Sequence, residues 1–341
     1  MNPEAAREAH KTLVERTPLY ENIIDAAGEY DAKFDSTANC SLAAHILNAV
    51  TIGVNTFVFT AISEDETVYD YEEDIRVLAA ALALHDTNKY VQEAYGVETD
   101  GNTSEAFDWY FDPEPDDLEG DPFGIEEFVG EGYRDDLLYL VQRTELTEDS
   151  TETREYHSDF AGLSRYCRIG DAVASVALKR GIEGAYEKLV EIFDAERVHL
   201  LRFTQLEQPI LNDVLLSSVK EVIAGEVDGA PDYGVVIGSS PDGVLYLGRQ
   251  IERTTLHESV ATRTPKRIAT DFEFDCKLTW NAFDYDILSE IEIPLDRKKK
   301  RIIQQATNLL ISGAGRDEGM ESVPKEFRQY LPVLLKSVYL E

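Results

Sequence analysis

Two long apolar segments constrain this chain more than any other feature of its sequence. Residues 40–62 are apolar on most sides of a helix, which predicts a buried core helix. Residues 72–96 form a second strongly helical segment, with a break expected at His85-Asp86. The first segment also carries His45. An unpaired buried imidazole is costly, so a fold that buries these segments must provide each histidine with a partner.

The other elements of the N-terminal part also have helical spacing. We expect Ser36 or Thr37 to cap the first core helix and Gly96 to end the second segment. We expect almost no strand before about residue 200. The remaining helical segments are the start of a helix pair in 1–30, then 125–146, 160–181 and 182–201.

Residues 99–124 differ in character from their neighbours. They contain three prolines, three glycines and many acidic residues, which predicts an irregular segment. The segment also carries Phe107, Trp109, Tyr110 and Phe111, so we expect partial packing onto the fold. A plain surface loop is favoured over a flap near a site.

The pattern changes to mixed helix and strand after about residue 200. Pro209 suits the start of a helix, and residues 233–251 predict a hairpin around the turn Ser-Pro-Asp-Gly. Residues 267–280 alternate at period two, and 297–315 have the pattern of a helix ended by glycine. We therefore predict an α+β protein, with an all-α domain over 1–200 and a smaller α/β domain over 201–341.

The charge of the chain is strongly one-sided. Sixty-six acidic residues face 32 basic ones, a net charge of −34 spread along the whole length. A dense carboxylate surface keeps a protein hydrated in molar salt, which is typical of halophiles. It also argues against a nucleic-acid interface in dilute buffer, but less so in molar salt.

Cysteine usage and the N-terminus favour a cytoplasmic protein. Cys40, Cys167 and Cys276 are widely spaced and form no CxxC pair, so a zinc finger is not expected. The first residues have no apolar signal core, and no run of about 18 apolar residues occurs. We predict no membrane segment.

Four residues on three helical segments form a candidate metal site. His45, the adjacent pair His85 and Asp86, and Asp171 all lie in apolar surroundings. Imidazole nitrogen and carboxylate oxygen can ligate one divalent metal, and Lys89 could neutralise phosphate oxygens. Taken alone, a histidine on an apolar helix is more often a hydrogen-bonded core residue, and Lys89 could simply pair with an acid.

The order His, His-Asp, then a distant Asp resembles the HD superfamily of metal-dependent phosphohydrolases. The HDxxK form of residues 85–89 is similar to that of CRISPR-associated HD nucleases. Strings over roughly 35–250 (HILNAV, ALHDTNKY, IGDAVAS, LEQPILNDVL, PDGVLYLG) resemble the N-terminal part of the large subunit of type I-D CRISPR effectors, the Cas-ten-d or Csc-three family. No GGDD motif is present.

The resemblance implies an all-α HD domain followed by the start of a palm-like region. It implies a hydrolase, a DNA-cutting HD nuclease of antiviral defence, with single-stranded DNA as substrate and with other effector subunits and a guide RNA complex as partners. Asp86 and Lys89 would be catalytic, and the metal would be manganese, nickel, cobalt or iron, with magnesium as a further candidate. The resemblance also implies that this chain is an N-terminal portion that stops early in the palm-like region.

The sequence departs from that family's pattern at one point. Related nucleases place further histidines between the HD pair and the last aspartate, whereas this chain has only His157 there. His157 could serve a second metal with Asp159 or Glu145, or it could cap the following helix. Two alternatives therefore stay open: an HD nucleotide phosphohydrolase, and a non-catalytic scaffold subunit that retains the metal site.

A basic cluster over 297–301 is the main exception to the acidic composition. Cations at the start of a helix oppose its dipole, so an anionic partner such as nucleic acid is one interpretation. A solvated first helical turn is the plainer one.

Overall fold

A computed structural model describes most of the first two thirds of the chain. The described residues are 17–32, 40–62, 68–114, 118, 120–130, 132–144, 158–202, 209–225, 233–240 and 243–252, the strands at 279–280 and 291–292, and the positions 9, 255, 256, 259 and 263.

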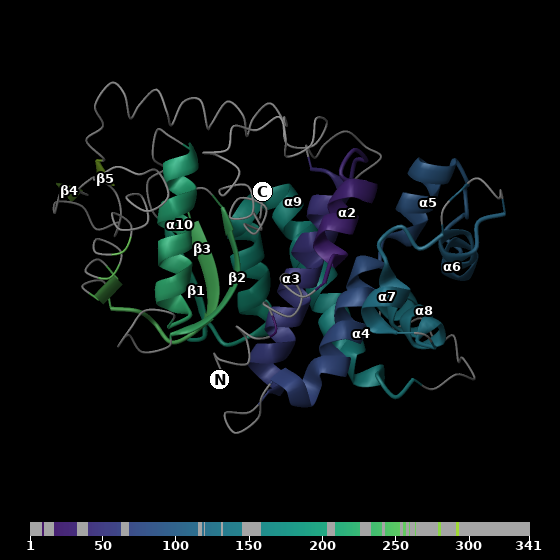
Figure 1. Cartoon of the computed structure of the whole chain (residues 1–341). Coiled ribbons are helices and arrows are strands. Elements are labelled where there is room, and N and C mark those ends of the chain that lie inside the picture. The colour runs from purple at the N-terminus through teal and green to yellow at the C-terminus, as the bar shows by residue number, and fades with distance from the viewer. Residues whose placement is uncertain are drawn as a thin grey trace. The chain divides into compact units, whose positions relative to one another are not determined.

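The chain divides into two compact units (Figure 1). The first runs from Met1 to Ile192 and the second from Phe193 to Tyr339. Helix and sheet both occur, as expected for an α+β protein.

The described elements of the first unit are all helical. They are α2 (Leu19–Ala27), α3 (Leu42–Ala61), η1 (Val68–Tyr71), α4 (Glu72–Ala83), α5 (Thr87–Tyr95), α6 (Thr103–Phe111), α7 (Ile125–Val129), α8 (Arg134–Thr144), η2 (Ala161–Leu163) and α9 (Ser164–Ile192).

Helices α3, α4 and α9 make the core of this unit. Helix α3 packs against both α4 and α9, and α2 packs on α3. Of the described helices, α3 is the one long and apolar enough to cross a membrane by length and composition. Yet 89% of its apolar window is buried inside the protein, so this helix is weak evidence against the predicted absence of a membrane segment. A core helix passes the same test, as predicted for residues 40–62.

The ends of the core helices follow local chemistry. The predicted cap at Ser36 or Thr37 is wrong: α3 begins at Leu42, where Ser41 Oγ accepts the amide of Ala44 at 3.2 Å. The break predicted at His85-Asp86 is confirmed, because α4 ends before this pair and α5 begins after it. Gly96 ends α5 with a φ of 71°, a left-handed conformation that glycine adopts without strain.

Residues 99–124 are more ordered than the sequence suggested. Helix α6 begins after Asn102, whose side chain accepts the amide of Glu105. Tyr110 is fully buried, and its hydroxyl bonds to the carboxylate of Asp121 and to the amide of Phe123. Residues 103–111 form a helix whose aromatic side chains Phe107, Tyr110 and Phe111 are buried. The surface-loop interpretation is therefore wrong for these residues.

Helix α9 reverses direction inside its length. Gly181 has φ 63° and ψ −162°, a region that is essentially restricted to glycine. The two helical stretches, 164–180 and 182–192, therefore join at a sharp kink. Arg180 and Glu187 form an ion pair across it.

The second unit contains a small sheet covered by one helix. An antiparallel sheet has the order β1-β3-β2, and α10 packs on β2 and β3. The hairpin β2–β3 and the helix start at Pro209 are confirmed. The described elements are β1 (Val198–Arg202), α10 (Pro209–Ile223), β2 (Gly234–Ser240), β3 (Gly243–Gly248), β4 (Thr279–Trp280) and β5 (Ile291–Glu292).

Strand β1 corrects the prediction for residues 182–201. The helix expected there ends at Ile192, and Val198–Arg202 instead pairs with β3. The residue pattern alone could not predict this strand, because so short a strand is stabilised by its hydrogen bonds to the partner strand. The period-two pattern of 267–280 and the helix of 297–315, which includes the basic cluster, lie outside the described residues except for Thr279–Trp280, which is β4.

The close approach of α3 and α9 can be tested by adding a methyl group at Gly170. A Cβ added at Gly170 would lie 2.6 Å from the carbonyl oxygen of Ala49 and 2.9 Å from Leu82. We predict that Gly170→Ala lowers the free energy of unfolding by about 1–3 kcal/mol, because overpacked cores must shift. Urea unfolding in molar KCl measures this.

Gly162→Ala is the matched control, since a Cβ there would meet nothing within 4 Å. An unchanged unfolding midpoint for Gly170→Ala would contradict the close packing of these two helices.

Candidate metal centre

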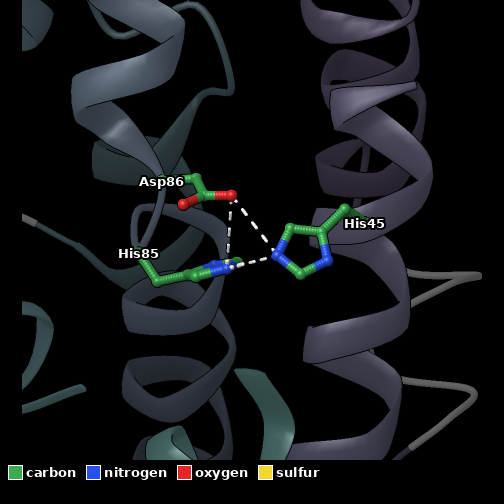
Figure 2. A group of neighbouring side chains, drawn as sticks. All are labelled: His45, His85 and Asp86. Atoms are coloured by element: carbon green, nitrogen blue, oxygen red, sulfur yellow. Dashed lines mark hydrogen bonds and ion pairs between the residues drawn. The ribbon is translucent and has the colours of Figure 1, made fainter. Parts of the chain in front are cut away.

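Three helical segments bring the predicted ligands together. His45 lies in the first turns of α3, His85 and Asp86 occupy the break between α4 and α5, and Asp171 lies on α9. Because α3 packs against both α4 and α9, these side chains meet in the core of the first unit. Figure 2 shows His45, His85 and Asp86 pointing toward one another.

The distances between the candidate ligand atoms are short and similar. His45 Nε2 lies 3.1 Å from His85 Nε2 and 3.3 Å from Asp86 Oδ2, and His85 Nε2 lies 3.6 Å from Asp86 Oδ2. Asp171 Oδ1 lies 3.6 Å from each of the two imidazole Nε2 atoms.

These separations fit a bound cation. Ligand atoms about 2.0–2.2 Å from a metal, at tetrahedral angles, lie roughly 3.3–3.6 Å from one another. The ligand atoms of His45, His85 and Asp86 all lie within 4.8 Å of one another. This buried cluster could therefore hold a metal ion, and the predicted presence of a metal site is supported to that extent.

The backbone orients the imidazole of His85. Its Nδ1 lies 2.6 Å from the carbonyl oxygen of Leu82, which can only accept a hydrogen bond. The Nδ1 atom must then carry the proton, which leaves the lone pair of Nε2 facing the cluster. A carbonyl that fixes the tautomer in this way is the usual outer partner of a metal-binding histidine.

Burial and charge determine the protonation of the cluster. His45 and His85 are 2% and 4% exposed, and burial lowers the pKa of His45 despite its contact with Asp171. Burial alone would raise the pKa of Asp86, but His85, His45 and Lys89 outweigh it, so that pKa is lowered. Burial likewise opposes ionisation of Asp171, yet His45 and His85 lower its pKa to about 2. Neutral imidazoles and ionised carboxylates are the forms that bind metals.

The cluster opens toward solvent on one side. The side chains of Asp171 and Lys89 are 28% and 30% exposed, whereas that of Asp86 is 9% exposed. Lys89 Nζ donates to Asp86 Oδ2 at 2.7 Å, so the lysine does pair with an acid. It reaches that acid from the solvent side, where a ligand would arrive.

The sequence analysis did not identify Ser175, which supports the cluster, and the structure does not test His157. Ser175 Oγ donates to Asp171 Oδ1 at 3.1 Å and orients that carboxylate. The i, i+4 spacing on one helix is the signal that could have found it. His157 and Glu145 lie outside the described residues, so the second metal site stays a prediction.

Metal binding should stabilise this protein measurably. A ligand at about 100 times its Kd stabilises the folded state by about 2.7 kcal/mol, so we predict that manganese raises Tm by about 5 °C or more over chelator-treated protein. His45→Ala and Asp171→Asn should abolish the rise, as measured by thermal unfolding in molar KCl.

His199→Gln is the control, because His199 belongs to the second unit and packs on Tyr246. If His45→Ala showed the same rise as the unaltered chain, surface carboxylates rather than this cluster would be the binding site.

Comparison with known proteins adds no family assignment. No protein-family model and no curated protein matches this chain. The interpretation of the cluster therefore depends on its own geometry and chemistry.

Proposed function

We propose that this protein is a metal-dependent phosphohydrolase of the HD type, acting as a nuclease on single-stranded DNA. The observation that carries the proposal is the convergence of two imidazoles and two carboxylates, from three helical segments, on one partly open site. The resemblance of HDxxK and its flanking strings to type I-D CRISPR effectors supports the choice of substrate and of a multisubunit setting with a guide RNA.

Charge balance favours a divalent cation and an anionic substrate. Asp86, Asp171 and Lys89 carry formal charges of −1, −1 and +1, so the ionised cluster sums to −1 with neutral imidazoles. A buried net negative charge is unfavourable, and a divalent cation changes the sum to +1. That local charge can attract a phosphodiester although the whole chain carries −34.

The residues of the cluster have separable roles in this proposal. A divalent cation supplies Lewis acidity toward a phosphate oxygen and toward water when it is bound. His45 and His85 contribute neutral nitrogen ligands, the latter held in one tautomer by Leu82. Asp171, oriented by Ser175, contributes a partly exposed carboxylate ligand.

Lys89 is suited to hold the phosphate. Its ammonium group is partly exposed beside Asp86, and it can donate to a phosphate oxygen while staying near that carboxylate. A fixed cation at developing negative charge stabilises the transition state without moving. Lys89 thus acts on the substrate, whereas Asp86 acts on the metal.

Cleavage of labelled DNA tests the function directly. We expect single-stranded DNA to be cut in molar KCl with manganese or nickel, and we expect His85→Ala/Asp86→Ala to lose all cutting because the metal ligands are gone. Double-stranded DNA serves as the comparison substrate.

Two alternatives are distinguished in the same experiment. A folded, metal-loaded chain that leaves DNA intact but hydrolyses deoxynucleoside triphosphates or cyclic nucleotides would be a nucleotide phosphohydrolase. Metal binding with no turnover of any of these would make the chain a scaffold subunit and would sink the nuclease proposal.

The proposed role of Lys89 has its own test. We predict that Lys89→Met keeps the metal-dependent rise in Tm and lowers kcat for DNA cleavage by about 100-fold, the usual effect of removing one electrostatic stabiliser. Single-turnover cleavage measures it. Lys188→Met, which removes an exposed lysine paired with Glu191, is the control. A loss of metal binding in Lys89→Met would instead assign the lysine a purely structural role.

A further inference from the structure

The reversal of α9 creates a small basic cavity on the first unit. The cavity has a volume of about 380 Å³ and is lined by residues of both helical stretches. Ile169, Ala172 and Ile192 form its apolar part, and the guanidinium-bearing side chains of Arg165 and Arg168 complete its lining. Both arginines are exposed.

Within the described part of the chain, these two arginines have no acidic partner, in contrast to several others. Arg76, Arg134 and Arg180 each form an ion pair with a carboxylate. No described acidic side chain forms an ion pair with Arg165 or Arg168. In a chain with 66 acidic residues, two neighbouring arginines without an acidic partner mark a local site for an external anion.

The cavity is close to the candidate metal centre along the same helix. Arg168 precedes Asp171 by one turn, so the two side chains lie on adjacent stripes of α9. Arg165 lies six residues before Asp171, about 9 Å along the helix axis and about 120° around it.

We propose that Arg165 and Arg168 form a phosphate subsite that holds the substrate strand beside the metal centre. The proposal rests on the phosphodiesterase function proposed above and narrows it to substrates that carry further phosphates beyond the scissile one. Guanidinium groups donate two parallel hydrogen bonds to phosphate oxygens. The apolar part formed by Ile169, Ala172 and Ile192 offers a surface for a sugar or base.

A nucleic-acid strand suits this cavity better than an acidic protein does. Repulsion from the −34 charge acts on either partner, but a strand is also anchored at the metal centre one turn away. Binding at both points is then intramolecular, and each contact raises the local concentration of the other.

Strand binding by the metal-free full chain tests the subsite without any cleavage. Fluorescence anisotropy of a labelled oligothymidylate is measured with chelator present, over the range of KCl in which the circular dichroism stays native. We expect R165Q/R168Q to bind at least about five-fold more weakly, with the slope of log Kd against log [KCl] shallower by roughly 1.4, or 0.7 per lost contact.

K179Q/K188Q is the matched control. It removes two positive charges from the same helix, away from the cavity lining and from the ion pair across the kink, and should bind the strand as the unaltered chain does. Equal weakening in both double variants, or no weakening in R165Q/R168Q, would overturn the subsite. Polyglutamate is the second probe: arginine-dependent binding of polyglutamate without binding of oligothymidylate would assign the cavity to an acidic protein and overturn the proposal.

The outcome can be separated from that of the proposed function. Arginine-dependent strand binding in a chain that cuts no DNA would leave the subsite standing and remove the nuclease. Cutting of DNA by R165Q/R168Q with an unchanged KM would remove the subsite and leave the nuclease standing.

Discussion

The close contact between α3 and α9 is the interaction on which the candidate metal centre depends. A Cβ on Gly170 would lie 3.3 Å from the Cα of Gly53, so the two helices touch almost backbone to backbone. Asp171 follows Gly170 directly, and His45 lies two turns before Gly53. Without that approach, the carboxylate of Asp171 could not reach the imidazole of His45 at 3.6 Å. Small residues therefore position the site although they take no part in its chemistry.

The cluster itself is an electrostatic arrangement that a bound cation would complete. Two buried imidazoles and a buried carboxylate face one another, and Leu82 holds the proton of His85 on the side away from them. Lys89 compensates one carboxylate from the solvent side. The remaining negative charge explains why such a group would bind a divalent metal and why the loaded site would then attract phosphate, in a chain whose surface otherwise repels it.

Helix α9 contributes to both the candidate metal centre and the basic cavity. Its first stretch supplies Asp171 to the metal centre and the two unpaired arginines to the neighbouring cavity. Its reversal at Gly181 provides Ile192 for the lining of that cavity. One helix thus carries residues of both the proposed catalytic site and the proposed strand-binding site. The geometry of that helix fixes how far apart these residues lie.

The sequence by itself determined the helical core segments, the break at His85-Asp86, the hairpin after residue 233 and the four residues whose ligand atoms converge. Each of these depends on periodicity, on turn chemistry or on the cost of burying a polar group alone, all of which are local properties. Only the tertiary structure decided the helix at Thr103–Phe111, the strand at Val198–Arg202 and the pairing state of Arg165 and Arg168. Those features depend on which partner comes close in space, and the contact of two helices or strands distant in sequence leaves no periodic signal in either one.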